Sequence, residues 1–180
     1  MRITREETTG MVIDMQEKLI PAMAEQDDLL KNCRILILGM KELGIPLIVT
    51  QQYTKGLGET VEPVKSIIHN FSPVEKREFS CCNEPLIAER IKEINKKQII
   101  LCGIESHICV LQTAIDLKDA GFVPVVVMDC VSSRTLGNLD LAAERFRHEG
   151  IMMTSCESVL FELTRASTAP EFKTISKLIK

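Results

Sequence analysis

Five short aliphatic runs punctuate the chain, and each is bounded by glycine, proline or polar residues. They lie at residues 11–13, 47–50, 98–102, 123–128 and 151–154. Runs of this length, rich in Val, Ile and Leu and bounded by turn residues, are typical of strands buried on both faces of a sheet. The pattern therefore predicts five buried strands.

The segments between these runs carry apolar residues at helical spacing. Residues 29–43 place one apolar stripe along a predicted helix, made of Leu29, Cys33, Leu36, Met40 and Leu43. Gly44 is expected to end this helix. Further helices are expected at 84–94, with Asn83 as the cap and Pro85 in the first turn, at 107–120, at 136–149, from Ser155 onward and at 170–179. Alternating strands and helices predict an α/β fold in which right-handed crossovers build a parallel sheet with helices on both faces.

Residues 51–82 fit neither pattern. This stretch of about thirty residues is rich in Gly, Pro and Ser, and long irregular segments in compact proteins usually serve function. The length of 180 residues predicts one domain spanning 1–180. Ligands of parallel α/β folds bind beyond the carboxyl ends of the strands, so the polar residues at those ends are the candidates for chemistry.

The composition narrows the classes of partner. Hydrophobic residues make up 45% of the chain but aromatic residues only 4%, which predicts an aliphatic, sulfur-rich core. The formal net charge of −3 leaves no basic field for nucleic acid or an anionic membrane surface, and no apolar run reaches the ~18 residues of a membrane span. Because the N-terminus shows no signal peptide, we interpret the seven cysteines as thiols in a reducing cytoplasm.

Three polar side chains stand out as candidates for chemistry. Asp14 directly follows the first predicted strand, and Lys76 lies in the irregular stretch among alternating charges. Cys109 falls in the first turn of a predicted helix, where unpaired N–H groups are expected to lower the pKa of its thiol. Each has a simpler interpretation: a helix cap for Asp14, a solvated surface residue for Lys76 and a buried inert thiol for Cys109.

In order and spacing, these positions resemble the Asp-Lys-Cys triad of the isochorismatase-like cysteine hydrolase superfamily, which includes nicotinamidases and N-carbamoylsarcosine amidase. The resemblance runs from Gly10 to Lys180 and is greatest to isochorismatase-domain-containing proteins of unassigned substrate. The stretches that carry it are Val12-Ile13-Asp14-Met15-Gln16, Thr50-Gln51-Gln52-Tyr53-Thr54-Lys55-Gly56-Leu57-Gly58, Leu101-Cys102-Gly103-Ile104-Glu105-Ser106-His107-Ile108-Cys109, Asp129-Cys130-Val131-Ser132-Ser133-Arg134 and Glu157-Ser158-Val159-Leu160-Phe161.

The resemblance implies a three-layer αβα sandwich with a six-stranded, mostly parallel sheet, and residues 64–70 are the expected sixth strand. It implies that Asp14 moves the proton of the thiol, that Lys76 holds the two charges together, and that Cys109 attacks a carbonyl carbon to form a thioester. A non-proline cis peptide at Ile104-Glu105 would aim the N–H of Glu105, with that of Cys109, at the developing oxyanion. Members of the family usually assemble into homo-oligomers, and the same is expected here.

Two departures from the family narrow the chemistry. Nicotinamidases carry an Asp-x-His metal site after the second strand, where this chain reads Thr50-Gln51-Gln52-Tyr53-Thr54 and has only three His overall, so no metal or other cofactor is expected. True isochorismatases cleave a vinyl ether and lack the Cys. Cys109 therefore favours acyl chemistry on a small amide or another C–N substrate.

The substrate pocket is expected to be lined by Gln52, Tyr53, Phe79 and His107. Simpler interpretations are a partly exposed loop aromatic for Tyr53, a core residue for Phe79 and a satisfied residue near a helix start for His107. Three alternatives to amide hydrolysis stay open: ester or thioester hydrolysis by the same triad, a catalytically silent binding protein, and thiol redox sensing. The scarcity of aromatic residues favours a small aliphatic or carboxamide substrate.

Overall fold

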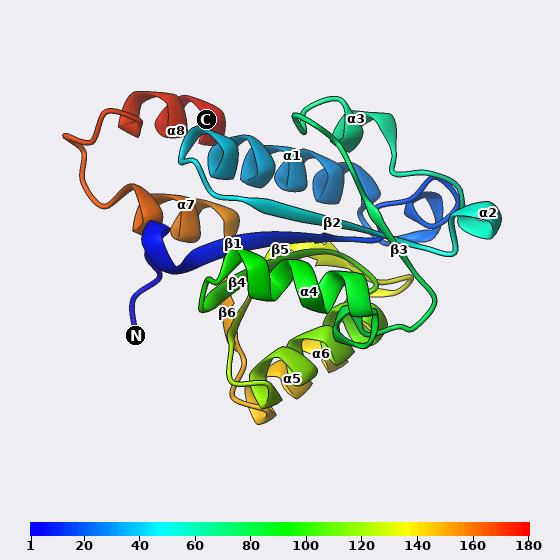
Figure 1. Ribbon diagram of the computed structural model, residues 1–180. Coiled ribbons are helices and arrows are strands. Elements are labelled where there is room, and N and C mark those ends of the chain that lie inside the picture. The colour runs from blue at the N-terminus through cyan, green and yellow to red at the C-terminus, as the bar shows by residue number, and fades with distance from the viewer.

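The computed structural model describes residues 1–180 and contains a six-stranded sheet in which every neighbouring pair is parallel (Figure 1). The strand order is β3-β2-β1-β4-β5-β6. The strands are β1 (Thr8–Ile13), β2 (Leu47–Gln52), β3 (Val74–Lys76), β4 (Gln98–Ile104), β5 (Val123–Ser132) and β6 (Met152–Thr154). The predicted α/β class with a six-stranded parallel sheet is confirmed.

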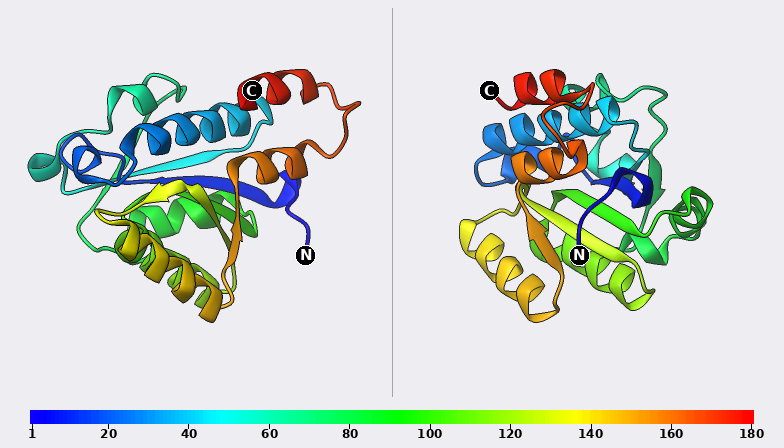
Figure 2. Two further views of the ribbon diagram at one scale, coloured as in Figure 1. Left: turned by 180° about the vertical axis from the view of Figure 1, so that it is seen from behind. Right: turned by 90° about the vertical axis from the view of Figure 1, so that its left-hand side faces the viewer.

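Helices cover both faces of this sheet, as the end-on view shows most directly (Figure 2). One face carries α1 (Gln26–Glu42), α3 (Glu62–Lys65), α7 (Cys156–Thr164) and α8 (Phe172–Ile179). The other carries α4 (Pro85–Ile94), α5 (Leu111–Asp119) and α6 (Leu136–His148). Shorter turns are α2 (Thr54–Leu57), three 3₁₀ turns at Arg5–Glu7, Ile20–Ala22 and Cys81–Asn83, and a π-helical turn at Ser106–Val110.

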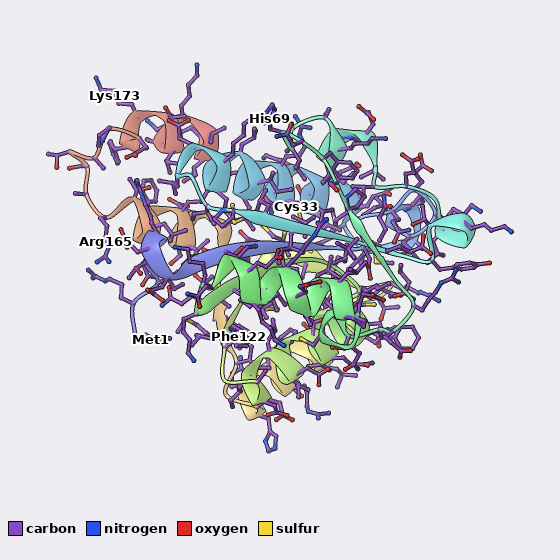
Figure 3. The ribbon with its side chains drawn as sticks, viewed as in Figure 1. Met1, Cys33, His69, Phe122, Arg165 and Lys173 are labelled. Carbon is purple, nitrogen blue, oxygen red and sulfur yellow. The ribbon has the colours of Figure 1, made fainter.

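Two apolar layers fill the space between the sheet and the helices. The layer under α1 and α7 contains four thiols, those of Cys33, Cys102, Cys130 and Cys156. Figure 3 labels Cys33 on α1, and its Sγ lies 3.2 Å from the carbonyl oxygen of Cys130 in the sheet. Among the buried side chains, Phe146 is the only aromatic ring, so the predicted aliphatic, sulfur-rich core is confirmed.

The sixth strand does not lie where it was expected. Residues 62–65 form the helical turn α3, with a proline in its first turn, and the sixth strand is Val74–Lys76 at the sheet edge. Proline at a helix start is favourable because its fixed φ suits the helix and its missing N–H has no partner to lose there. The prediction of 64–70 is therefore wrong, and the correction matters because the true strand ends on Lys76.

Two predicted helix starts also differ from the structure. The N-cap of α4 is Glu84, without a side-chain cap, while Asn83 belongs to the preceding 3₁₀ turn. The helix expected from residue 107 starts instead with the π-helical turn, and α5 begins at Leu111. The cap at Ser155 is confirmed, because its hydroxyl accepts a hydrogen bond from the N–H of Ser158.

None of the helices combines the length with the apolar composition that a bilayer crossing requires.

Candidate active site

Asp14, Lys76 and Cys109 all follow or end strands at the same edge of the sheet. Asp14 comes directly after β1, Lys76 is the last residue of β3, and Cys109 lies in the π-helical turn after β4. Parallel strands place their carboxyl ends together, and in Figure 1 this is the end of the sheet near α2. The fold therefore gathers the three residues that the sequence singled out.

Asp14 and Lys76 form a buried ion pair. Nζ of Lys76 lies 2.7 Å from Oδ2 of Asp14, and neither side chain is exposed to solvent. The other carboxylate oxygen, Oδ1, accepts a hydrogen bond of 2.8 Å from the hydroxyl of Thr50. No helix begins directly after Asp14, whose φ is 50°, so its interpretation as a helix cap is wrong. The interpretation of Lys76 as a solvated surface residue is also wrong, because its side chain is buried.

The ammonium of Lys76 is also held by neutral oxygens. Oε1 of Gln52 accepts at 2.6 Å, the carbonyl oxygen of Phe79 at 3.1 Å and that of Glu78 at 3.3 Å. Burial by itself would lower the pKa of Lys76, but the charge of Asp14, followed by those of Cys81 and Cys109, outweighs burial, so the pKa is raised. Lys76 is therefore a cation at neutral pH.

A close approach of β1 and β4 brings the Cys109 turn beside Asp14. Gly103 has a φ of +114°, and a Cβ atom at this position would lie 2.0 Å from the carbonyl oxygen of Ile13. The β4–β5 register also shifts between Leu101 and Gly103. Only glycine fits here, because an L side chain would be both strained at this φ and in collision with the neighbouring backbone.

The thiol of Cys109 is protonated at rest. Its pKa is raised to about 12, first because burial disfavours the thiolate and second because Asp14 repels it, while Lys76 acts in the opposite direction. The lowered pKa expected at a helix start is wrong, because burial of the thiol and repulsion by Asp14 dominate its ionisation. A thiol of this kind is a nucleophile only if a base takes its proton during attack.

The segment between β4 and Cys109 contains a cis peptide bond joining Ile104 and Glu105. The carboxylate of Glu105 is buried and pairs with Arg134, whose Nε lies 3.2 Å from Oε1 of Glu105 and whose backbone N–H donates to Oε2 at 3.3 Å. The carbonyl of Glu105 accepts from the N–H groups of Ile108 and Val110. The turn that carries Cys109 is thus anchored to the end of β5.

A pocket of about 260 Å³ opens above these residues. Its lining is mainly apolar and consists of Asp14, Leu19, Gln52, Leu57, Phe79, Ile104, Glu105, Ile108, Cys109 and Arg134. Gln52 and Phe79 were expected to line it. Arg134 was not singled out from the sequence, although it lies just beyond the end of β5, and the same kind of position after a strand had identified Asp14. Leu19 and Leu57 lie on connecting segments and carry no such signal.

Two other predicted pocket residues lie outside this lining. The ring of Tyr53 packs against Gly56, and the guanidinium of Arg77 stacks on it at 4.2 Å. Nδ1 of His107 lies 2.9 Å from the hydroxyl of Ser133. Both side chains are therefore engaged within the protein. No three His, Cys, Asp or Glu side chains are arranged so that they could hold a metal ion.

Comparison with known proteins gives matches along most of the chain. A family model, the isochorismatase domain, matches residues 9–158. The secreted isochorismatase effector Isc1 of Phytophthora sojae is 37% identical over 177 residues, which cover 94% of this chain and 82% of that protein. Isochorismatase domain-containing protein 2 of Danio rerio is 36% identical over 180 residues, which cover 98% of this chain and 90% of that protein.

Among solved structures, MAR1 ribonuclease from Caenorhabditis elegans superposes on this chain with a TM-score of 0.93. It is 36% identical in sequence, and the match covers 99% of this chain and 92% of that one. The likeness therefore includes the sheet, both helical layers and the strand ends that hold the buried ion pair.

Proposed function

Because this chain belongs to the isochorismatase family, we propose that it is a hydrolase that cleaves a small amide or related C–N acyl substrate with Cys109 as the nucleophile. The observation that carries this proposal is a fully buried Asp14–Lys76 ion pair whose Asp14 lines the same pocket as the buried thiol of Cys109. Ionisable groups withdrawn from water in a cleft, with specific charged partners, are typical of catalytic sites.

In the first step, Asp14 takes the proton of the Cys109 thiol while Sγ attacks the carbonyl carbon of the substrate. The S–C bond forms as the carbonyl π electrons move to the oxygen. With a pKa of about 12, the resting thiol is ionised in only roughly 10⁻⁵ of molecules at pH 7, so a base beside it is required. Lys76 stabilises the negative charge as it passes between sulfur and carboxylate.

The tetrahedral intermediate needs hydrogen-bond donors for its oxyanion. We propose the backbone N–H groups of Glu105 and Cys109, which belong to the anchored turn after β4. One such donor is worth roughly 3–4 kcal/mol of barrier in hydrolases that use this device. When the intermediate collapses, the C–N bond breaks and Asp14 returns its proton to the leaving nitrogen. Water then attacks the thioester carbon while Asp14 takes a proton from it. The S–C bond breaks, the carboxylic acid product leaves, and Asp14 returns the proton to Sγ of Cys109.

The pocket favours a small substrate with an aliphatic body. Its volume of about 260 Å³ suits a small molecule, and Leu19, Leu57 and Ile108 offer apolar contacts to it. Arg134 is the only cation in the lining and offers hydrogen-bond donors to a polar end of the substrate. Ester or thioester hydrolysis by the same residues, or ligand binding without turnover, are the alternatives.

The name of the Caenorhabditis elegans relative raises RNA as another substrate. Proteins that bind a phosphodiester backbone neutralise several phosphates with Lys and Arg. Here one arginine faces a mainly apolar pocket, and the chain carries a formal charge of −3. The amide reaction is therefore the better supported, and RNA belongs in the test.

We further propose that the protein acts as a homo-oligomer on a small-molecule substrate in the cytoplasm, without nucleic acid or membrane partners. All seven cysteines are free thiols, which suits a reducing compartment. Light scattering at several protein concentrations tests the assembly, and a molecular mass equal to that of one chain throughout would contradict it.

The reaction is tested by incubating the wild-type protein with a panel of short-chain amides, ureido acids, esters and RNA oligonucleotides. Cys109→Ser and Asp14→Asn should abolish hydrolysis, and Cys82→Ser, which changes a thiol outside the pocket lining, should retain it. Intact-protein mass spectrometry should detect an acyl adduct on Cys109. Equal turnover by wild type and Cys109→Ala would overturn the proposal.

A further inference from the structure

A circuit of contacts, closed by the backbone between Asp14 and Gln16, joins the ends of three neighbouring strands at the pocket. From Asp14, it passes through Lys76 to Gln52 and returns through Gln16 to the segment that follows β1. The two Lys76 contacts are 2.7 Å to Asp14 and 2.6 Å to Gln52. The side-chain amide of buried Gln16 makes two hydrogen bonds with the backbone of Gln52. It accepts from the N–H of Gln52 at 2.7 Å and donates to its carbonyl oxygen at 2.9 Å.

The side-chain amide of Gln52 has one possible orientation in this circuit. Its Nε2 donates to the carbonyl oxygen of Arg77 at 2.7 Å, so its Oε1 must face the ammonium of Lys76. All four polar atoms of Gln52 therefore have partners within the protein.

The acceptor that Gln52 supplies is neutral, and this has an electrostatic consequence. Asp14 is the only carboxylate that contacts Lys76, and the remaining acceptors are an amide and backbone carbonyls. A second carboxylate at this place would compete with Asp14 for the ammonium. It would also repel the thiolate of Cys109, which lines the same pocket as Gln52.

We propose that Gln52 is a positioning residue, which holds the ammonium of Lys76 between Asp14 and Cys109 through a neutral acceptor. The inference rests on the proposed function, because it assigns Gln52 a role in the ionisation of the proposed nucleophile. Gln16 fixes Gln52 in turn. Gln52, which the sequence suggested as a substrate contact, lines the pocket, and its Oε1 accepts from the ammonium of Lys76.

The test measures the ionisation of Cys109 without any substrate. Iodoacetamide alkylates a thiolate: the S–C bond forms, the C–I bond breaks and iodide leaves. The rate of labelling of the Cys109 peptide, followed by mass spectrometry between pH 7 and 9 where the fold is stable, is proportional to the thiolate fraction and therefore reports any shift in the midpoint of the thiol. The variants are Gln52→Glu, which adds a charge, and Gln52→Met, which removes the acceptor at similar size.

The matched control is Gln51→Glu, which adds the same charge on the neighbouring residue of β2. The amide of Gln51 contacts the hydroxyls of Thr60 and Thr54 rather than Lys76. Circular dichroism and thermal melting show which variants are folded. Gln52→Met decides the outcome if Gln52→Glu does not fold.

We expect the midpoint of Gln52→Glu to rise by about one pH unit, which slows labelling at pH 7 about tenfold. Gln52→Met should show a smaller rise, and Gln51→Glu should match the wild type. The inference would be overturned if both Gln52 variants kept the wild-type midpoint and only their KM for substrate were raised. If the wild type hydrolyses no amide but the midpoint shifts, the proposed function fails and the role of Gln52 stands.

Discussion

The Nζ atom of Lys76 lies 2.7 Å from Oδ2 of Asp14, and both side chains are completely buried. An intact pair of this kind contributes little net stability, because loss of hydration offsets the attraction between the charges. Removing one partner is different, because it leaves the other charge buried without compensation. The pair therefore links the stability of the fold to the chemistry proposed for the pocket.

Lys76→Met should destabilise the protein by about 3–5 kcal/mol, because Asp14 then remains as an unpaired buried charge. The double variant Asp14→Asn with Lys76→Met should recover part of this loss. Urea unfolding measures both. The control is Lys65→Met. Lys65 forms a 2.7 Å pair with Glu59 that is exposed to solvent, so its loss should have little effect on stability. Equal losses in the Lys76 and Lys65 variants would contradict the prediction.

Alkaline pH should destabilise the fold through its buried thiols. Burial is the main cause that raises the pKa of Cys81 and Cys109 to about 12 and that of Cys82 to about 11, from an ordinary value of 9.0. Because the folded pKa values are raised, this stability is complete below pH 9 and is lost as pH rises toward 12. The loss amounts to roughly 1.4 kcal/mol per pH unit for each thiol.

The measurement is the free energy of unfolding between pH 8 and 11. Above pH 9, the free energy of unfolding of Cys81→Ala should fall less steeply with pH than that of the wild type. Below pH 9, the pH dependence of the two proteins should be the same. The same slope in wild type and Cys81→Ala would show that burial does not control the ionisation of this thiol.

Acid should weaken the attachment of the N-terminal segment. Both terminal nitrogens of Arg5 lie 2.9 Å from the two carboxylate oxygens of Glu171, and this hydrogen bonding is the main cause that lowers the pKa of Glu171 to about 2. Because the folded pKa is lowered, the contribution is present above the ordinary value of 4.5 and is lost as pH falls toward 2. Glu171→Gln should lower Tm at pH 7 but not near pH 2. Glu144→Gln, at an exposed position on α6, is the control.

Gly103→Ala should prevent the close approach of β1 and β4. Gly103 and Gly44 both have positive φ, at +114° and +68°, but only the first has backbone within reach of a Cβ atom, whereas nothing lies within 4 Å at Gly44. Gly44→Ala should therefore cost about 1 kcal/mol from strain alone. Gly103→Ala should lose several times as much, or fail to fold, in thermal unfolding. Similar Tm values for the two variants would contradict this account.

The strand ends could be found from the sequence because β1 and β4 are continuous apolar runs that stop abruptly. Asp14 and the turn of Cys109 follow directly from those stops. Lys76 could not be found in this way, because β3 has only three residues and one of them, Glu75, is exposed. Its place in the site came from resemblance alone, and the strand that carries it was expected some residues earlier.

What the sequence could not supply depends on distances between segments far apart in the chain. The raised pKa of Cys109 arises from burial and from Asp14, and neither follows from a position in a helix turn. The contact between Gln52 and Lys76 joins residues 24 positions apart. Leu19 and Leu57 become pocket walls because their connecting segments fold over the strand ends.

The chain has one tyrosine and no tryptophan, and this gives the protein a built-in optical probe. Tyr53 directly follows Gln52, its N–H donates to the carbonyl of Lys76 at 3.1 Å, and Arg77 stacks on its ring. Intrinsic fluorescence therefore comes from a single ring attached to the backbone that carries Gln52 and Lys76. Ligand binding or a substitution that moves this backbone should change the emission, and no tryptophan signal masks the change.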